Sequence, residues 1–401
     1  MKQKVVVIGH GSTSRLGIVR ALAELDCEIT VIVTSFKNKK GELNTVRPFD
    51  CYSRYIKRIL YVFAGESEGL VQLLLDECKD SYQKVIVLPD SDFSAAVLDD
   101  NQERLRDYFL LPHINHKAGA IRWWMDKSRQ KSLAEEIGLN YAKSCKIDVH
   151  NKAYVIPNHI VYPCFTKPQI TITGGKQYFR KCDNEEQLRN LLDYVATKGD
   201  AVILAEEYVC IESEYALLGF SDGNNVVIPG IIHFLANSKS HFGIAMKGEV
   251  IPTDGFESLL GMFKQFVLKV GFVGVFDIDF FWGNGKWWFG EMNLRFGGSG
   301  YAITKMGVNL PVMLVKHLIG ERWDDMPQKV KGTASYVNER MCIDDWYRRY
   351  LSTKEFKQTL RSADVSFVYD NNDQLPQKMF EKLYTELYLK RLLKRIIKRK
   401  L

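Results

Sequence analysis

The sequence contains no apolar run that approaches the roughly 20 residues needed for a transmembrane helix. It also shows no cleavage pattern of a secretory signal, because Met1-Lys2-Gln3-Lys4 leads directly into the apolar segment Val5–Ile8. Its eight cysteines include no CxxC pair and no spacing typical of a metal site. These absences argue against a membrane-spanning or disulfide-rich protein. We therefore expect a protein of the reducing cytoplasm, with the thiols packed as small apolar side chains.

Basic charge is concentrated at the C-terminal end. The chain has a net charge of +7, and residues 390–401 alone hold seven basic side chains and no acid, so the rest is close to neutral. This argues against a nucleic-acid-binding surface elsewhere. In the same C-terminal segment, apolar residues recur at the spacing of one helix face: Leu389, Leu392, Leu393, Ile396 and Ile397. The pattern predicts a basic amphipathic helix over 389–401, which either lies on an anionic membrane surface at the inner face or docks on a protein.

Residues 4–34 alternate strand, glycine-rich loop, helix and strand, which is typical of a βαβ unit and a parallel sheet. The glycines of the loop are too widely spaced for a dinucleotide fingerprint, and no acid closes the second strand, so an NAD-dependent oxidoreductase is a poor alternative. The loop either only turns the chain or binds a substrate through Ser12, Thr13 and Arg15.

A second polar segment, Asp90-Ser91-Asp92, follows a later strand. It either binds a ligand at the edge of the sheet or, as we favour, caps the helix that follows.

A hairpin dominates the second half of the chain. Val273–Trp282 and Lys286–Asn293 are rich in aromatic residues and are joined by Gly283-Asn284-Gly285, a typical tight turn. A helix is predicted before the hairpin over 256–270, and another after it over 301–319.

Four oxygen-bearing side chains interrupt these apolar strands. Asp277 and Asp279 share one strand face, and Glu291 and Asn293 share a face of the partner strand. We expect them to converge across the hairpin, where a divalent cation would offset the cost of burying carboxylates. The alternative is a hairpin whose acids are solvated.

Lysines and glycines between residues 120 and 176 are candidates for phosphate binding. Lys127 lies early in a helix predicted over 122–138, and Lys167 ends a predicted strand. Gly174-Gly175-Lys176 follows, and is either a flap whose backbone amides approach phosphates or a plain hairpin turn.

Taken together, these segments make the sequence resemble an ATP-grasp enzyme over about residues 1–320. The segments that carry the resemblance are TKP at 166–168, GGK at 174–176, AEEYV at 205–209 with Glu214, DIDF at 277–280 and GEMNLRFGGSG at 290–300. The most specific feature is an acid placed twelve residues before an E-x-N-x-R segment. Many relatives have N-P-R where this chain has Asn293-Leu294-Arg295, which leaves the metal-binding side chain unchanged but the backbone less fixed.

The resemblance implies roles for individual residues. The implied ATP-binding residues are Lys127 and Lys167 for the phosphates, Gly174 and Gly175 as the flap, Glu206 or Glu207 with Tyr208 and Val209 as the adenine hinge, and Glu214 for the ribose. The implied ligands of Mg²⁺ or Mn²⁺ are Asp279, Glu291 and Asn293. The implied catalytic cations are Arg295 and Lys167.

The implied fold class is α/β and α+β: a pre-ATP-grasp, Rossmann-like parallel α/β domain over 1–112, followed by a two-part clamp with antiparallel sheets. The clamp would comprise a lid over 113–205 and a larger part with the metal site over 206–328. A C-terminal extension would cover 329–401.

The implied activity is an ATP-dependent ligase that joins a small-molecule carboxylate to an amine through an acyl phosphate. The branch that the sequence most resembles is that of carbamoyl-phosphate-synthase-like carboxylate–amine ligases, including D-aspartate ligases, which points to cell-wall or surface-polysaccharide synthesis. The alternative is a scaffold or regulator that binds ATP and Mg²⁺ without turnover.

Overall fold

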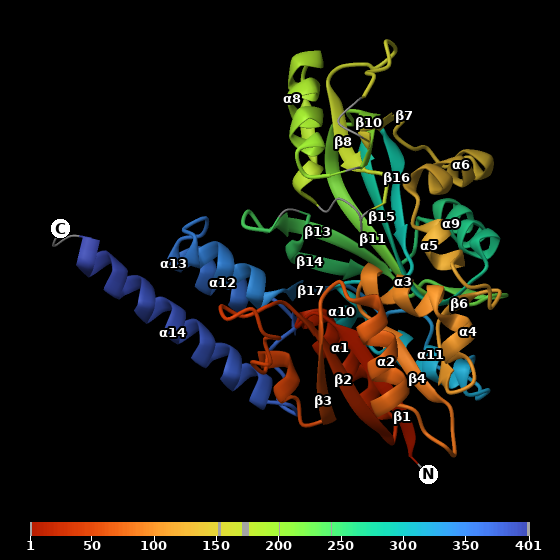
Figure 1. Ribbon diagram of the computed structural model, residues 1–401, viewed down its shortest axis with the longest axis vertical. Coiled ribbons are helices and arrows are strands. Elements are labelled where there is room, and N and C mark those ends of the chain that lie inside the picture. The colour runs from red at the N-terminus through yellow and green to blue at the C-terminus, as the bar shows by residue number, and fades with distance from the viewer. Residues whose placement is uncertain (1, 151–153, 171–175, 200, 242, 399–401) are drawn as a thin grey trace.

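The computed structural model describes residues 2–150, 154–170, 176–199, 201–241 and 243–398, with only the backbone for residues 387 and 390–398. Gly174 and Gly175 therefore lie outside the described residues. Figure 1 shows a parallel-sheet domain, a central antiparallel sheet, a smaller sheet beyond it and a long C-terminal helix that points away from the body.

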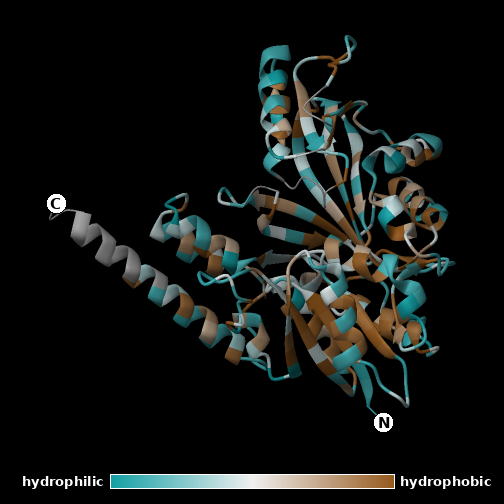
Figure 2. Ribbon diagram, viewed as in Figure 1, coloured by the Kyte–Doolittle hydropathy of each residue, from teal (hydrophilic) through white to brown (hydrophobic). Residues whose placement is uncertain are grey.

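The N-terminal part is a five-stranded parallel sheet with strand order β3-β2-β1-β4-β5. Its strands are β1 (Gln3–Gly9), β2 (Cys27–Ser35), β3 (Ile56–Phe63), β4 (Val85–Pro89) and β5 (Phe109–Leu110). The α-helices between them are α1 (Thr13–Ala21), α2 (Ser67–Glu77), α3 (Asp92–Asp100) and α4 (Gln102–Leu105). A parallel sheet covered on both faces needs strands that are apolar on both sides, and these strands are largely in hydrophobic colours in Figure 2. The predicted parallel α/β domain is confirmed.

The second sheet is antiparallel and has four strands in the order β7-β10-β8-β9; we call this sheet and its helix the four-stranded unit. Its strands are β7 (Ser144–Asp148), β8 (Cys164–Pro168), β9 (Arg180–Cys182) and β10 (Val202–Glu207). Helix α8 (Glu185–Ala196) covers one face through four buried residues at helical spacing: Leu188, Leu191, Leu192 and Val195. The other face carries Lys167 and Glu206.

The third sheet has nine strands and follows the order β16-β15-β11-β13-β14-β17-β18, with β12 beside β11 and β6 beside β15. Its strands are β6 (His113–Ile114), β11 (Ile211–Asp222), β12 (Val226–Val227), β13 (Ile231–Asn237), β14 (Ala245–Ile251), β15 (Phe272–Gly283), β16 (Lys286–Asn293), β17 (Ala334–Val337) and β18 (Val365–Ser366). The predicted hairpin is confirmed as β15 and β16.

The two faces of this sheet are packed differently. Helix α9 (Glu257–Val270) lays Phe263 and Phe266 against Phe280 and Phe289 of the hairpin, with ring centroids 5.4 Å and 4.9 Å apart. The opposite face shares a core with the N-terminal domain, to which Leu218 and neighbouring β11 residues contribute. The acids of the hairpin lie on this second face.

Two predicted helices are each divided in the structure. The segment 122–138 forms α5 (Ala120–Trp124) and α6 (Lys127–Ile137), because Asp126 caps α6 by accepting from the backbone N–H of Ser128. The segment 301–319 forms α10 (Gly300–Lys305) and α11 (Leu310–Leu318). Gly307 has a φ of +91° between them, and Asn309 caps α11. A single continuous helix was therefore the wrong prediction in both places.

The region after residue 329 is joined closely to the rest of the molecule. Strand β17 pairs with β14 and β18 pairs with β17, so both extend the nine-stranded sheet. Helices α12 (Glu339–Tyr347) and α13 (Thr353–Arg361) lie between them in sequence. The predicted domain boundaries at 112, 205 and 328 stay predictions; the sheet assignment changes between 110 and 113 and between 207 and 211.

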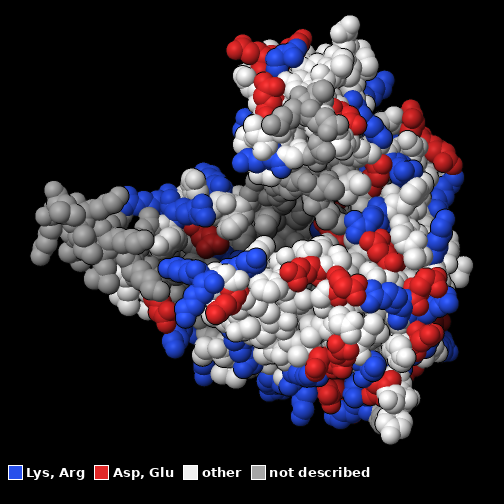
Figure 3. All heavy atoms as spheres, in the orientation of Figure 1, with Lys and Arg blue, Asp and Glu red and all other residues white. Residues whose placement is uncertain are grey.

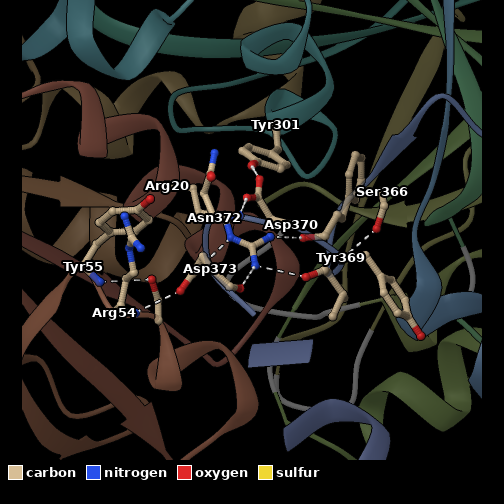
Figure 4. Close-up of polar contacts among 12 residues, drawn as sticks. Arg20, Arg54, Tyr55, Tyr301, Ser366, Tyr369, Asp370, Asn372 and Asp373 are labelled. Carbon is tan, nitrogen blue, oxygen red and sulfur yellow. Dashed lines mark hydrogen bonds and ion pairs between the residues drawn. The ribbon is translucent and has the colours of Figure 1, made fainter. Parts of the chain in front are cut away.

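Arg20 of helix α1 fixes the chain that follows β18 (Figure 4). Its Nε donates to Asp373 Oδ2 at 3.0 Å, and its two terminal nitrogens donate to backbone carbonyls of Phe367, Val368 and Asp373. Tyr301 donates to Asp370 Oδ2 at 2.7 Å in the same cluster. The C-terminal region is thus fastened to both the N-terminal domain and α10.

Helix α14 (Leu375–Lys398) begins well before the predicted segment and packs near its start, where Phe380 is buried 5.0 Å from the Phe49 ring. Within the described residues, no helix is long and apolar enough to cross a membrane. All eight cysteines are free. Five of them are buried as predicted, but Cys210 is exposed, so apolar packing of every thiol was wrong.

Candidate functional site

The hairpin brings the predicted metal ligands together. In the register of β15 and β16, Asp279 lies opposite Glu291 and Asp277 lies opposite Asn293. Directly opposed residues point to the same side of a sheet, so all four share one side, which we call the acid face. Asn293 Nδ2 lies 3.5 Å from Asp279 Oδ2. The predicted convergence of these side chains is confirmed.

Alternation along the strands explains why acids occur in such an apolar hairpin. Ile278, Phe280 and Met292 point to the other side, into the core under α9, and are fully or almost fully buried. The acids between them are half-buried and face the space between the nine-stranded sheet and the four-stranded unit. In Figure 3 a recess lies between these two parts. Each strand therefore carries two different faces, one for the core and one for the site.

Lys127 is the first residue of α6 and forms an ion pair with Glu291, with Nζ 2.8 Å from Oε2. The Lys127 side chain is only 3% exposed, against 24% for Glu291. Burial by itself would raise the pKa of Glu291, but Lys127 and Lys167 outweigh it and lower the pKa to about 2. Glu291 is consequently ionised at neutral pH, as a cation ligand must be.

Lys167 lies on β8 and forms an ion pair with Glu206 of β10, with Nζ 3.0 Å from Oε1. A second lysine, Lys131, donates to the same carboxylate oxygen and to the carbonyl of Ala142 at 2.7 Å. Burial lowers the pKa of Lys131 to about 8, although Glu206 opposes that shift. Sequence reasoning missed Lys131. Its position four residues after Lys127 on a helix is the signal that would have found it, since residues at that spacing share a helix face.

The predicted hinge, residues 206–209, connects the four-stranded unit to β11. A cavity of about 520 Å³ opens beside it and is lined partly by Lys131, Glu206 and Glu207. Tyr208 is exposed and lies under Lys181, whose Nζ is 5.0 Å from the ring centroid. No acid-face residue lines this cavity. The hinge is linked to the acid face by Lys167 instead, which pairs with Glu206 and also lowers the pKa of Glu291.

Glu214 lies on β11, the strand next to the hairpin. In the register of β11 and β15, Ala216 is opposite Asp279 and Glu214 is opposite Phe281, so Glu214 points to the side of the acid face. Its Oε2 accepts from Asn237 Nδ2 at 3.0 Å.

Arg295 follows β16 and reaches across to the N-terminal domain. Its Nε donates to Asp92 Oδ1 at 2.9 Å, and its Nη1 lies 3.6 Å from Asp277 Oδ2. Burial raises the pKa of Asp277 to about 6, with Arg295 acting in the opposite direction. Asp277 Oδ1 is buried with no hydrogen-bond partner among the described atoms. The acid face therefore contains a buried oxygen that a bound group would satisfy.

The glycine-rich loop after β1 does not present all the predicted binding groups. Arg15 is fully buried and donates to Asp50 Oδ2 at 2.8 Å and to the carbonyl of Gly9 at 2.6 Å. Of the two alternatives for this loop, substrate binding through Arg15 does not fit the structure, because the guanidinium is used within the core. Ser12 caps α1 and donates to Asp90 Oδ2 at 3.2 Å.

At the end of β4, the predicted helix cap is confirmed. Ser91 caps α3 in a capping box with Ser94. The Asp90 carboxylate fills the space over Gly9, since a Cβ on Gly9 would lie 1.6 Å from Asp90 Oδ1. The loop thus needs glycine there to make room for an acid.

A magnesium ion fits the acid face by the chemistry of the donors. Asp279, Glu291 and Asn293 supply two carboxylates and an amide, all hard oxygen donors. Among the described residues, no group of three or more His, Cys, Asp or Glu side chains is arranged to hold a metal on its own. A small set of protein ligands suits Mg²⁺, which usually keeps positions for water and substrate phosphates.

Comparison with known proteins agrees with this arrangement. The ATP-grasp domain family model matches residues 132–308. Over 188 residues the chain is 22% identical to the carbamoyl phosphate synthase large chain of Halomonas eurihalina, a match that covers 46% of this chain and 17% of that relative. This chain thus spans less than a fifth of the relative's length.

Two solved structures share the fold over most of the chain. The L-amino acid ligase from Bacillus licheniformis superposes with a TM-score of 0.61 at 17% identity, over 84% of this chain and 79% of the other. The biotin carboxylase domain of the Hydrogenobacter thermophilus 2-oxoglutarate carboxylase, solved with MgADP, ADP and bicarbonate, also gives 0.61 at 17% identity, over 84% and 74%. Residues 132–308 thus match the ATP-grasp domain model, and the two solved structures share the fold of most of this chain.

Proposed function

We propose that this protein is an ATP-dependent ligase that forms an amide bond between a carboxylate and an amine through an acyl phosphate. The observation that carries the proposal is the meeting of the acid face with Lys127 and Lys167 in one space of an ATP-grasp domain. Three segments that are far apart in the sequence bring lysines and carboxylates together here. The lysines can bind a polyanion, and the carboxylates can bind the divalent cation that accompanies it.

The nucleotide would lie between the two antiparallel sheets. Lys127 and Lys167 would exchange their carboxylate partners for phosphate oxygens, and Lys131 would keep Glu206 neutralised when Lys167 turns to the nucleotide. The backbone of the hinge would bind the base, and Glu214 would bind the ribose hydroxyls. The flap role of Gly174 and Gly175 remains an expectation from the family resemblance.

Asp279, Glu291 and Asn293 would hold Mg²⁺, or Mn²⁺ in its place. When bound, the ion would offset the negative charge of the triphosphate during transfer. The MgADP complex of the 2-oxoglutarate carboxylase domain supports this choice of nucleotide and metal.

The reaction would then proceed in two steps. A carboxylate oxygen of the acid substrate attacks the γ-phosphorus of ATP, the bond to the β-phosphate oxygen breaks, and ADP leaves. Arg295 and Lys167 stabilise the charge on the transferred phosphoryl group. The amine nitrogen then attacks the acyl carbon, inorganic phosphate leaves, and the nitrogen loses a proton. An amino acid is a reasonable acid or amine substrate, because the structurally similar Bacillus licheniformis protein is an L-amino acid ligase.

A phosphate-release screen tests the proposal. Purified protein is incubated with ATP, Mg²⁺ and pairs drawn from a panel of amino acids, small carboxylates and amines. We expect phosphate and ADP only when both an acid and an amine that fit are present. Nucleotide binding without phosphate release from any pair would favour the alternative, a scaffold or regulator that binds ATP and Mg²⁺.

The C-terminal helix gives a further part of the proposal. We propose that residues 389–401 contact an anionic membrane surface at the inner face, where a cell-wall or surface-polysaccharide precursor would be processed. The support is the concentration of basic residues on an amphipathic segment. Sedimentation with anionic vesicles should retain the full chain but release a chain ending at residue 388; equal recovery in the supernatant would exclude the contact.

A further inference from the structure

Arg295 is held by two acids from different parts of the chain. Asp277 belongs to β15 beside it, whereas Asp92 lies 203 positions away in the N-terminal domain. Arg295 and Asp92 are each about one-fifth exposed, so the pair borders the site and is only partly open to water. The shorter contact is the one to Asp92, at 2.9 Å against 3.6 Å.

Asp92 is not required to build its own helix. It is the first residue of α3, and that helix is capped by Ser91, whose hydroxyl accepts from the backbone N–H of Ser94. An acid at the first helical position is favourable but contributes little there. The Asp92 side chain is instead directed to Arg295, at the carboxyl edge of the parallel sheet.

The remaining contacts fix the other edge of the guanidinium. Nη1 donates to the carbonyl of Phe296 at 3.2 Å and faces Asp277. Asp277 is itself confined, because a Cβ on Gly297 would lie 2.6 Å from its Oδ2. Since the guanidinium is planar, a donor held at Nε and another at Nη1 determine the orientation of the whole group.

We propose that Asp92 is a positioning residue for Arg295, so that the N-terminal domain sets the orientation of a cation that acts in the ATP-grasp site. The inference rests on the role proposed above for Arg295. It predicts that the chemical step depends on the contact between the two domains. Nucleotide binding, which uses Lys127, Lys167 and the hinge, does not depend on it.

The test compares two isosteric changes at opposite ends of one helix. Asp92→Asn removes the charge next to Arg295. Asp100→Asn is the matched control, because Asp100 ends the same helix and accepts from Arg122 Nε at 2.7 Å on the surface. Both variants are assayed with the acid and amine pair that releases phosphate fastest in the screen, and ATP affinity is measured by the fluorescence of a labelled ATP analogue.

We expect Asp92→Asn to lower kcat by about 10- to 100-fold, with the KM and affinity for ATP changed less than about threefold. Asp92→Glu should recover part of the loss, and Asp100→Asn should behave as wild type. In an Arg295→Lys background, Asp92→Asn should add little, because the geometry it supports is already lost.

A wild-type kcat in Asp92→Asn, or full additivity of the two changes, would overturn the inference. An equal loss of kcat in Asp100→Asn would also overturn it, since a general effect on α3 would then be responsible. Absence of turnover in the wild-type protein is a different result, because it would reject the proposed function itself.

Discussion

Two groups of ion pairs in this molecule differ in how far their side chains are exposed. At the junction of the N-terminal domain, Arg15 pairs with Asp50 and Arg20 with Asp373, and all four side chains are at most 2% exposed. In the site, Lys127 pairs with Glu291 and Lys167 with Glu206, where Glu291 is 24% exposed and Lys167 is 13% exposed.

The difference separates charges that hold the fold from charges that are available for chemistry. The Arg20 guanidinium donates to one carboxylate and three backbone carbonyls, so exchanging partners would leave several buried groups unsatisfied. In the site, by contrast, the Glu291 and Lys167 side chains are partly exposed, so each pair has one member that can turn to another charged group. We infer that the junction pairs are structural and the site pairs are exchangeable.

The largest effect that would sharpen this comparison is expected at Glu291. Glu291→Ala should lower phosphate release by at least about 10³-fold, because the proposed cation loses a charged ligand. The free energy of unfolding should also fall, by about 1–3 kcal/mol, because Lys127 is only 3% exposed and loses the carboxylate that pairs with it. Phosphate release and urea unfolding measure the two quantities.

The matched control for this change is Glu249→Ala. Glu249 also lies on a strand of the nine-stranded sheet, is 28% exposed and pairs with a base, His233, at 2.9 Å. It should leave turnover unchanged. Turnover in Glu291→Ala close to that of the wild type would remove the proposed metal site.

The reverse behaviour is expected at Arg20. Arg20→Met should lower the free energy of unfolding by about 3–5 kcal/mol, because Asp373 would remain buried without its partner. Turnover per folded molecule should be retained. Arg58→Met is the control: Arg58 pairs with Glu77, both are 46% exposed, and the change should cost less than about 1 kcal/mol. A small loss of stability in Arg20→Met would contradict the division into structural and exchangeable pairs.

The smallest expected effect concerns Asp90, which lies between the two groups. Burial raises its pKa from 3.8 to about 7, and Asp50 adds to the shift while Arg15, Ser12 and Arg295 oppose it. The folded protein therefore binds this proton more tightly than the unfolded chain, so the wild type loses stability as pH rises from about 4 to 7.

Asp90→Asn removes this dependence, and its oxygen can still accept from Ser12. The stability of the variant relative to wild type should be greater at pH 8 than at pH 5 by about 2 kcal/mol. Urea unfolding at both pH values measures the difference. An equal difference at the two pH values would show that Asp90 is ionised throughout.

Sequence periodicity was sufficient for the parts of the fold in which local pattern and packing agree. The hairpin, the βαβ start and helix α9 follow from alternation, turn residues and helical spacing, and the structure has all three. The division of α5 from α6 and of α10 from α11 was missed, because capping by Asp126 and Asn309 outweighed the apolar pattern that continues across each break.

The candidate site was likewise predictable only where local pattern decides the geometry. Opposition of Asp279 and Glu291 follows from strand alternation once the hairpin is recognised, because the turn sets the register. The partnership of Lys131 with Glu206, the burial of Arg15 and the contact of Asp92 with Arg295 join segments 35 to 203 residues apart. No local pattern in the chain specifies which of these charged residues meet.

The sequence by itself determined which strand faces are apolar, where the acids of the hairpin lie and which family the segments resemble. These features depend on residue type and on spacings of two or about four residues, which the backbone imposes locally. Only the tertiary structure decided which charges are closed within the core and which border the site. That choice depends on how the three sheets pack, and burial is a property of the assembled molecule.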